Sequence, residues 1–585
     1  MALADRLLRI DLSTQNIESE KIPESWLERF IGGKGLSARY LYRELEPGID
    51  PLGPENVLLF MLGPLTGKTP GESRHAIVTK SPLTGTFLDS YTGGSVPESL
   101  DRALSDHLGV LITGTSPDPV TLRIEDDDAT IESATDLWGG TVTETCSAFD
   151  HPTACIGPAG ERLVRYATIA SDGGDHHAAR GGVGAVMGSK NLKAVVADGE
   201  ESGQGTATAE AEARYRSTDI GNWQATSETV ETIDFANEVG VLPTRGWQEG
   251  SFEGADNIGI ESIREAAVGR ERPDAAVSGG FRVESDEGET VPRGATSISL
   301  GAGLGIDDFD AVAVLGSACD DLGIDLISAG NAIAWTIRAA EDGLLVRDIE
   351  FGDVESARGL LDEIAHRSSP LGDVLAEGID RAVRKYGGDE LIPTVKGMDL
   401  PTYDPRRSPS MSLAYATSDR GACHRRARPV LEEVFATEEW SDRRRAAAVV
   451  AEQNLRSFLW CLVVDDFAGE ALWKDGDQEW LRVLGIERSR DELLRIGERV
   501  WTLTRLFNVR EGLSREDDAL PSALKNPVCD GSNEGTRIDS AEFDRLLSVY
   551  YDIRDWDARG RPIASLLSRL DLNDVVDRQT PVGND

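Results

Sequence analysis

The chain has 585 residues, and 60 Lys and Arg against 102 Asp and Glu give it a formal net charge of −42 at pH 7. This acidity repels nucleic acid and anionic membranes, so neither is an expected partner. Because the acidic residues are spread along the chain and do not form one tail, we interpret them as an adaptation to high salt. We therefore expect a halophilic, cytoplasmic protein, and the hydrophobic content of 40% indicates that it is globular.

The sequence gives no sign of membrane insertion, secretion or disulfide bonding. No segment reaches the roughly eighteen apolar residues of a membrane helix, and residues 1–14 lack the apolar stretch of a signal peptide. None of the cysteines forms a CxxC pair, so we expect isolated core or surface residues in a reducing cytoplasm. The cysteines are Cys146, Cys155, Cys319, Cys423, Cys461 and Cys529.

Residues 1–200 are predicted to be rich in β-structure, because short apolar runs alternate there with Gly, Pro, Asp and Ser clusters. The predicted strands are Leu7–Leu12, Val57–Leu62, His75–Thr79, Gly109–Thr113, Val120–Ile124, Leu163–Ala170 and Leu192–Ala197. One helix is expected over Glu98–Leu108. Glycine turns are expected at 32–35, 63–67 and 90–94.

The periodicity changes after a polar segment of small residues, 199–213, which we interpret as an inter-domain linker. Apolar residues then recur at a spacing of three and four, which predicts helices. The predicted helices are Asp308–Asp321, Leu326–Asp342, Val354–His366, Leu371–Tyr386, Ser441–Val463, Arg490–Phe507 and Ser540–Tyr551. We expect an α+β protein with a β-rich domain over 1–200 and a helical region over 210–585, divided near residue 400 into subdomains 210–400 and 401–585.

The stretch Arg180–Lys193 concentrates four glycines between a leading arginine and two lysines. Glycines allow positive φ and close approach of the backbone to a ligand. Turned N–H groups beside cations favour an anion, best a phosphate. The glycine spacing fits neither a dinucleotide fingerprint nor a Walker loop. A tight turn between packed elements is the alternative interpretation, and a nucleotide-phosphate site is a weaker one.

Several stretches resemble the tungsten-dependent aldehyde ferredoxin oxidoreductase family, nearly from end to end. The matching stretches are 30–35, 63–67, 79–85, Arg180–Lys193, Cys319–Gly330, 403–406, Leu413–His424, Leu506–Gly512 and 550–556. The resemblance implies a cofactor between the domains, a tungsten or molybdenum bis-pterin whose phosphates are bridged by magnesium. It also implies a small aldehyde or related carbonyl substrate, and ferredoxin or another electron carrier as partner. Dimers are common in that family, so a homodimer is compatible with it.

The resemblance assigns roles to individual residues. The implied phosphate and magnesium ligands are Arg74, Arg180, Gly181 and Gly182, and the implied pterin loop contains Asp320, Gly323 and Asp325. A carboxylate accepts two N–H groups at a pterin edge, although capping of helix ends is an alternative role for both aspartates. His424 matches the histidine beside the metal, where imidazole would donate to a carbonyl oxygen or carry a proton.

The sequence also departs from the family it resembles. A [4Fe-4S] cluster needs thiolates, yet the segment expected to supply three, Arg272–Glu289, contains no cysteine, and only Cys461 matches the fourth ligand. We therefore predict no cluster. The resemblance places the second pterin loop on Arg456–Cys461, where its Asp and Gly are replaced by Arg456 and Leu459. The family's active-site glutamate falls near Ala295, and an expected asparagine is Tyr91.

Two functions remain compatible with this pattern. The first is an oxidoreductase that converts an aldehyde to a carboxylic acid at the metal-pterin cofactor. The second is a catalytically reduced paralogue that acts as a partner subunit or as a cofactor-binding protein.

Overall fold

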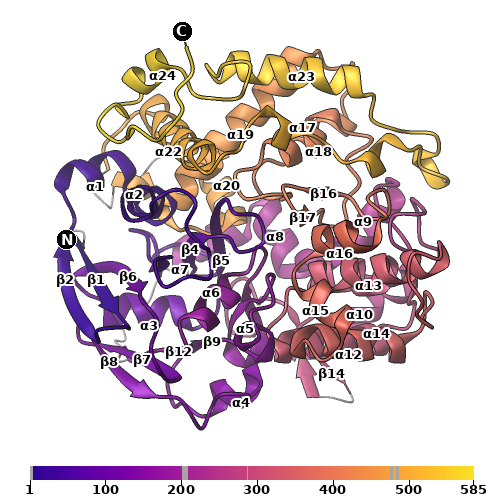
Figure 1. The fold of residues 1–585 in the computed structure, drawn as a ribbon, viewed down its shortest axis with the longest axis horizontal. Coiled ribbons are helices and arrows are strands. Elements are labelled where there is room, and N and C mark those ends of the chain that lie inside the picture. The colour runs from indigo at the N-terminus through magenta and orange to yellow at the C-terminus, as the bar shows by residue number, and fades with distance from the viewer. Residues whose placement is uncertain (1–3, 200–208, 286–287, 475–478, 483–485, 585) are drawn as a thin grey trace.

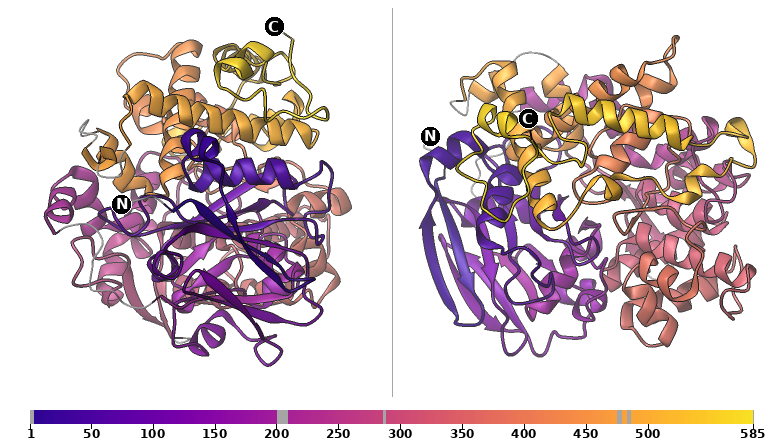
Figure 2. Two further views of the ribbon diagram at one scale, coloured as in Figure 1. Left: turned by 90° about the vertical axis from the view of Figure 1, so that its left-hand side faces the viewer. Right: turned by 45° about the horizontal axis from the view of Figure 1, so that its top comes forward.

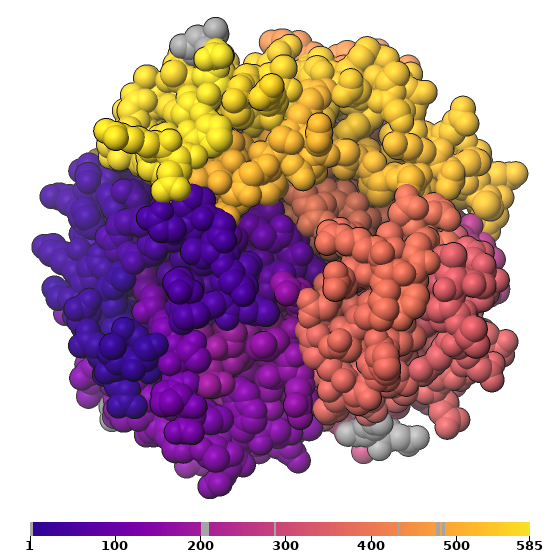
Figure 3. Space-filling model, viewed as in Figure 1, coloured from indigo at the N-terminus to yellow at the C-terminus, as the bar shows by residue number. Residues whose placement is uncertain are grey.

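The computed structural model describes residues 4–199, 209–285, 288–474, 479–482 and 486–584, and has a β-rich N-terminal part followed by mostly helical parts. Strands gather at the lower left of Figure 1, and helices fill the right and the top. Figure 3 shows the β-rich N-terminal part, the middle of the chain and its C-terminal part meeting near the middle of one face. The α+β prediction is confirmed. Most of the predicted linker, residues 200–208, lies outside the described residues.

Two six-stranded sheets form the N-terminal part. The first, in the order β2-β1-β6-β3-β4-β5, contains β1 (Arg6–Asp11), β2 (Asn16–Lys21), β3 (Leu58–Met61), β4 (His75–Lys80), β5 (Phe87–Thr92) and β6 (His107–Thr113). The second, in the order β11-β10-β9-β12-β7-β8, contains β7 (Val120–Glu125), β8 (Asp128–Ser133), β9 (Thr153–Cys155), β10 (Ile169–Ser171), β11 (His176–Ala178) and β12 (Leu192–Ala197). Each sheet has one parallel pair, β1 with β6 and β7 with β12, and the other pairs are antiparallel.

The sheets share one apolar core, and the first sheet is also covered on its other face. Alternate residues of β3 show this, because Leu58 and Phe60 belong to the core between the sheets, whereas Leu59 and Met61 belong to the core beneath the helices. A strand buried on both faces shows a continuous apolar run. The right panel of Figure 2 shows the sheets to one side of the helices, and the left panel shows C-terminal helices above the sheets.

Helices follow in the rest of the chain. Those of the middle part are α7 (Ala209–Arg216), α8 (Asp219–Thr226), α9 (Thr232–Glu238), α10 (Ile260–Ala266), α12 (Phe309–Leu322), α13 (Leu326–Glu341), α14 (Val354–His366), α15 (Pro370–Ala376) and α16 (Ile379–Tyr386). Those of the last part include α17 (Pro409–Thr417), α19 (Asp442–Leu462), α20 (Asp466–Lys474), α22 (Arg490–Arg510), α23 (Ser540–Ile553) and α24 (Ala564–Arg569). A small sheet joins β13 (Ala267–Arg270), β14 (Phe281–Ser285) and β15 (Gly288–Thr290).

The structure corrects several predicted elements. The helix predicted over 371–386 is two helices, since Gly378 breaks it with φ +96°. The strand predicted over 163–170 is reduced to the short β10, and the helix predicted over 98–108 ends at Ala103 in α3 (Val96–Ala103). The turn predicted at 90–94 begins inside β5.

The glycines at 32–35 also serve a different purpose from the predicted turn. They begin helix α2 (Gly33–Glu44), which packs on α19. A Cβ added at Gly33 would lie 2.2 Å from the carbonyl oxygen of Trp460, and one at Gly35 would lie 2.2 Å from that of Phe30. Glycine is therefore required by close approach of two backbones.

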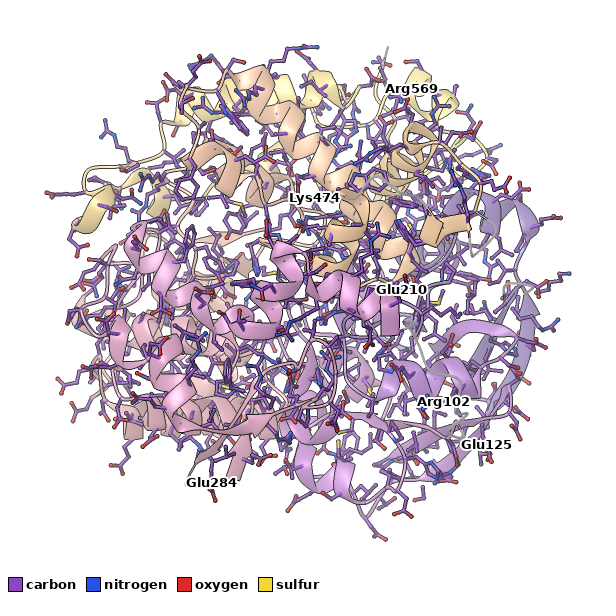
Figure 4. The ribbon with its side chains drawn as sticks, turned by 180° about the vertical axis from the view of Figure 1, so that it is seen from behind. Arg102, Glu125, Glu210, Glu284, Lys474 and Arg569 are labelled. Carbon is purple, nitrogen blue, oxygen red and sulfur yellow. The ribbon has the colours of Figure 1, made fainter. Side chains whose placement is uncertain are left out.

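Charged side chains cover the exterior. The labelled Glu125, at the end of β7, and Glu284, on β14, lie at the periphery in Figure 4, and both are exposed. Within the described residues no single helix is long and apolar enough to cross a membrane, and α19 with α20 passes that test only as a pair bent by 112°.

Candidate functional site

A cavity of about 330 Å³ lies between the two sheets and the helical parts. Its volume is in the range of small-molecule sites. Its lining is rich in charge from both halves of the chain. The charged or titratable side chains that line it are Glu72, Arg74, Tyr91, Asp175, His176, His177, Arg180, Glu228, Glu271, Arg272, Arg293, Asp320, Asp325, Arg420, Cys423, His424 and Arg425.

A larger surface groove of about 1180 Å³ lies where the three parts meet, but we do not place the site there. Two of its arginines, Arg165 and Arg367, are already paired with Glu377. None of the site residues expected from the sequence lines it. The smaller cavity, by contrast, is lined by Arg74, Arg180, Asp320, Asp325 and His424. The fold therefore brings five residues that are distant in the sequence together at this cavity.

Arg180 stands at the end of β11 in a strained turn. Arg180, Gly181 and Gly182 have φ of 70°, 75° and 89°, and Gly182 caps helix α6 (Val183–Ser189). The Arg180 guanidinium donates through Nη1 to Asp325 Oδ2 and Asp399 Oδ2, both at 3.2 Å. Burial lowers the pKa of Arg180, but Asp399 and Asp325 outweigh burial and raise it.

Asp325 combines two functions. It caps the N-terminus of α13 by accepting from the amide of Ile327 at 3.4 Å, and it binds Arg180. The capping alternative is therefore present together with a position on the cavity. Burial raises the pKa of Asp325, with Arg180 opposing the rise and Asp399 adding to it. Gly323, which ends α12 in a left-handed conformation with φ +66°, brings the chain round to Asp325.

A second helix–turn–helix in the structure has the same form. Helix α12 is followed by Gly323, Ile324 and Asp325, and helix α19 is followed by Val463, Val464 and Asp465. Val463 has φ 54°, in the left-handed region like Gly323. Asp465 accepts from the amides at 467 and 468 at 3.0 and 3.1 Å, at the start of α20. Asp465 thus corresponds in position to Asp325.

Each of these aspartates binds an arginine from a different sheet. Arg180, at the end of the edge strand β11, binds Asp325, and Arg74, which directly precedes β4, donates through Nε to Asp465 Oδ2 at 2.8 Å. A buried arginine–carboxylate pair has a defined geometry because the guanidinium donors are fixed in one plane. The cavity lining therefore contains the arginines of two similar Arg–Asp pairs.

This correspondence corrects our placement of the second loop on Arg456–Cys461. Arg456 lies inside α19, where its guanidinium binds Glu470 and Glu452. Cys461 is fully buried, is not among the cavity-lining residues, and donates to the carbonyl oxygen of Ser457 at 3.0 Å. Burial raises the pKa of Cys461 to about 12, which opposes the thiolate that a metal requires.

The donor set does not fit a [4Fe-4S] cluster. The segment expected to supply three cysteines contributes Arg272, Val277 and Gly279 to the cavity wall. The position that corresponds to the second loop's last residue is Asp465, a carboxylate. No group of three or more His, Cys, Asp or Glu with metal-binding geometry occurs among the described residues. Thiolates hold such clusters, and these residues do not supply them.

His424 reaches the cavity on the loop after α17, together with Arg420, Cys423 and Arg425. Its ring lies 5.3 Å from the ring of Tyr403. Burial, and then the neighbouring arginines, lower the pKa of His424 well below the ordinary value. The imidazole is therefore neutral at pH 7 and has one N–H donor and one acceptor.

Cys423 differs from the inert core residue that the sequence suggested. Burial opposes ionisation of this thiol, yet Arg420 and Arg426 lower its pKa to about 7. Arg420 Nη2 donates to the Cys423 sulfur at 3.1 Å. The cavity therefore holds a partly ionised thiol beside a neutral imidazole.

A cluster around His176 was missed by the sequence analysis. His176 Nδ1 lies 3.3 Å from Glu72 Oε1, and its Nε2 lies 3.3 Å from Glu271 Oε1. Glu271 also accepts from both Nη atoms of Arg293, at 2.7 and 3.0 Å. Burial opposes the charge on His176, but Glu72 and Glu271 outweigh it and raise the pKa. Proximity to Arg180 in the sequence was the one signal available.

The comparisons with known proteins agree with this architecture. The family model of the aldehyde ferredoxin oxidoreductase N-terminal domain matches residues 7–199, and that of domains 2 and 3 matches residues 206–572. The chain is 33% identical over 610 residues to the tungsten-containing aldehyde ferredoxin oxidoreductase of Pyrococcus abyssi, covering 98% of this chain and 99% of that protein. It is 34% identical over 593 residues to the protein of that name from Thermococcus kodakarensis, covering 95% and 96%.

A solved structure shares the fold. The active-site complex BamBC of benzoyl coenzyme A reductase, solved with 1,5-dienoyl-CoA, superposes with a TM-score of 0.79 at 22% identity, covering 98% of this chain and 97% of the other. That likeness concerns the fold alone. The family is shown by the matched models and relatives, which span nearly the whole sequence. The chain therefore belongs to the aldehyde ferredoxin oxidoreductase family of oxidoreductases.

Proposed function

We propose that this chain oxidises an aldehyde to a carboxylic acid with a tungsten or molybdenum bis-pterin held in the cavity. The observation that carries the proposal is the pair of Arg–Asp units, Arg180 with Asp325 and Arg74 with Asp465, whose two arginines both line that cavity. Two similar half-sites suit a cofactor made of two similar halves. The relatives that are tungsten-containing by name support the choice of metal.

The donors at the cavity fit such a group. Arginines present guanidinium donors for phosphates, and Glu72 and Asp320 present acceptors for the N–H groups of a pterin edge. Thr92 Oγ1 and Arg420 Nε are buried on cavity-lining residues without a hydrogen-bond partner among the described residues. Buried polar groups are nearly always satisfied, so these two atoms favour a ligand. A magnesium ion would complete the proposed cofactor.

His424 is the proposed catalytic residue. When bound, the cofactor supplies two-electron redox chemistry, which amino-acid side chains lack. The neutral imidazole of His424 would donate its N–H to the carbonyl oxygen of the aldehyde and would hold a proton there. Arg420 and Arg425, which line the same wall, would orient the carboxylate product.

We further propose that the protein works without a [4Fe-4S] cluster. The residue next to Asp465 already has partners, because Arg425 forms an ion pair with Asp466 at 2.8 Å and Trp460 Nε1 donates a hydrogen bond to the same carboxylate at 2.8 Å. Electrons would then pass to ferredoxin or another carrier docked on the surface. A soluble, salt-adapted homodimer in the cytoplasm is consistent with the acidic composition.

The second candidate, a catalytically reduced paralogue, is favoured by two specific features. Val463 replaces the glycine of the second turn, and Ala295 lines the cavity where an acid would be expected. Such a protein would serve as a partner subunit or as a cofactor-binding protein. The half-sites would then be a retained scaffold.

Metal analysis decides between the two. Protein purified in high salt from its own host is expected to contain about one tungsten or molybdenum per chain and no iron. Neither metal in a folded protein would favour the reduced paralogue, and about four irons per chain would contradict the cysteine argument. The His424→Asn variant is expected to keep the metal and lose aldehyde-dependent dye reduction, whereas Asp325→Asn loses metal and activity together.

A further inference from the structure

Two cysteines that look isolated in the sequence are in contact in the structure. Cys146 lies near the end of helix α4 (Val142–Ser147), and Cys155 ends β9. Their sulfur atoms are 3.6 Å apart. Cys155 is fully buried, whereas Cys146 is partly exposed. A reagent from solvent therefore reaches Cys146 first.

Both cysteines lie on well-anchored elements. Helix α4 begins at Thr141 with a complete capping box formed with Glu144, and Cys155 pairs with Ala170 of β10 and Ala194 of β12. A disulfide has an S–S length of about 2.05 Å, so the sulfurs must approach by about 1.6 Å from their present separation.

The surroundings give the two sulfurs different chemistry. The hydrogen bond with Cys155 lowers the pKa of Cys146, whereas burial raises it. A hydrogen bond from the backbone of Gly173 and the electrostatic effect of His177 lower this pKa further. The same contact, together with burial, raises the pKa of Cys155 well above its ordinary value. Cys146 is thus the better nucleophile, and Cys155 retains its proton.

We propose that Cys146 and Cys155 form a dithiol–disulfide pair that responds to hydroperoxides. The Cys146 thiolate attacks the peroxide O–O bond and becomes a sulfenic acid, and the other oxygen takes up a proton and leaves as water from hydrogen peroxide or as an alcohol from an organic hydroperoxide. The Cys155 thiol then attacks the sulfenic sulfur, so that the S–S bond forms and the sulfenic oxygen leaves as water. The two thiols lose two electrons, which the peroxide accepts, and an external dithiol restores them.

The cysteine pair lies next to the loop that carries Asp320 and Asp325. Three residues before Cys146 on α4, the amide of Thr143 donates to Asp321 Oδ1 at 3.2 Å and its hydroxyl donates to the carbonyl oxygen of Gly173 at 2.9 Å. His177, which lowers the pKa of Cys146, lies 3.1 Å from Asp320 Oδ1. The disulfide would therefore join α4 to β9 next to one wall of the cavity.

Mass spectrometry of the full-length protein tests this proposal. One tryptic peptide, residues 124–162, contains both cysteines and no internal Lys or Arg. Reduced protein is expected to take two alkyl groups on this peptide. After a small excess of hydrogen peroxide and quenching with catalase, the wild-type peptide is expected to take none and to be lighter by two hydrogens. Dithiothreitol is expected to restore both thiols.

Variants assign the order of the steps. In Cys155→Ser, Cys146 is expected to accumulate as a sulfenic acid that dimedone traps, and in Cys146→Ser, Cys155 is expected to stay reduced at the same dose. The exposed Cys529 is the internal control, since it has no neighbouring thiol. The proposal is overturned if the wild-type peptide keeps two alkylatable thiols while Cys529 is oxidised, or if Cys155 in Cys146→Ser reacts as fast as Cys146 in Cys155→Ser. Because the wild-type result alone is decisive, a variant that misfolds does not prevent the test.

Discussion

A buried group of charges connects the N-terminal part to the loop that carries His424. Lys34 Nζ, from α2, lies 3.1 Å from Asp89 of β5 and 2.6 Å from Asp419. Arg426 binds the same two aspartates. All four side chains are at most 3% exposed. The loop between Asp419 and Arg426 is the one that brings Arg420, Cys423 and His424 to the cavity, so this group fixes its position.

We predict that Lys34→Met destabilises the protein by about 3–5 kcal/mol, the range measured when one partner of a buried ion pair is removed. At an effective dielectric constant of about 20, the attraction of Lys34 is about 6 kcal/mol to Asp419 and about 5 kcal/mol to Asp89. Desolvation of the ammonium offsets several kcal/mol of this sum. Methionine keeps an apolar side chain between Phe87 and Trp460. It leaves the two aspartates with Arg426 as the remaining cation of the group.

Urea unfolding in high KCl, followed by circular dichroism and tryptophan fluorescence, measures the effect. The matched control is Lys21→Met, because Lys21 is 71% exposed in its pair with Asp5, and such exposed pairs contribute about 1 kcal/mol or less. The double variant Lys34→Met, Asp419→Asn restores the balance of charge and is expected to recover part of the loss. A Lys34→Met protein within about 1 kcal/mol of wild type would refute the reasoning.

Three further predictions follow from particular features. His75 is fully buried, neither ring nitrogen has a partner among the described residues, and burial lowers its pKa to about 3. Below pH 6.5 the unfolded chain therefore takes up a proton that the folded protein excludes, so stability falls by about 2 kcal/mol at pH 5, a loss that His75→Phe removes; an unchanged pH dependence of unfolding would contradict this. Gly182→Ala, whose Cβ would lie 2.2 Å from the carbonyl oxygen of Arg165, is expected to reduce folded protein on expression far more than Gly173→Ala, which has positive φ but open space. The net charge of −42 predicts that the thermal midpoint rises with KCl concentration, since salt screens the repulsion, and a falling midpoint in scanning calorimetry would oppose it.

Periodicity predicted the buried helices well and the acidic strands poorly. Val354–His366 coincides with α14, and the prediction for α13 differs by one residue at its end. The edge strands β2 and β8 carry the sequences NIESEK and DATIES, whose acidic residues conceal the alternation of a strand. Their pairing partners β1 and β7 supply the hydrogen bonds that hold them extended. The sequence of β2 or β8 alone does not reveal which strand pairs with it.

The cavity was predicted in part, because the motif residues lie on it whereas their partners come from elsewhere. Arg180 and Asp325 were named from the sequence, but Asp399, which binds the same guanidinium, lies in the short strand β17 (Met398–Asp399) and follows no motif. The second loop was misplaced because a cysteine guided the comparison. The left-handed turn at Val463 is visible only in the backbone. The spacing of residues in the sequence does not reveal an ion pair that forms between elements far apart in the chain.

Val463 bears on whether the second half-site is functional. A β-branched residue with positive φ is strained by about 1–2 kcal/mol, yet Val463 keeps the turn that Gly323 makes without strain. Its side chain is 1% exposed, and its Cγ2 fills the space that a Cβ at Gly33 or Gly63 would need. Packing against these glycines therefore stabilises the turn in place of a glycine. Because the turn still delivers Asp465 to Arg74 at 2.8 Å, loss of the sequence motif does not entail loss of the half-site, and this favours the oxidoreductase over the reduced paralogue.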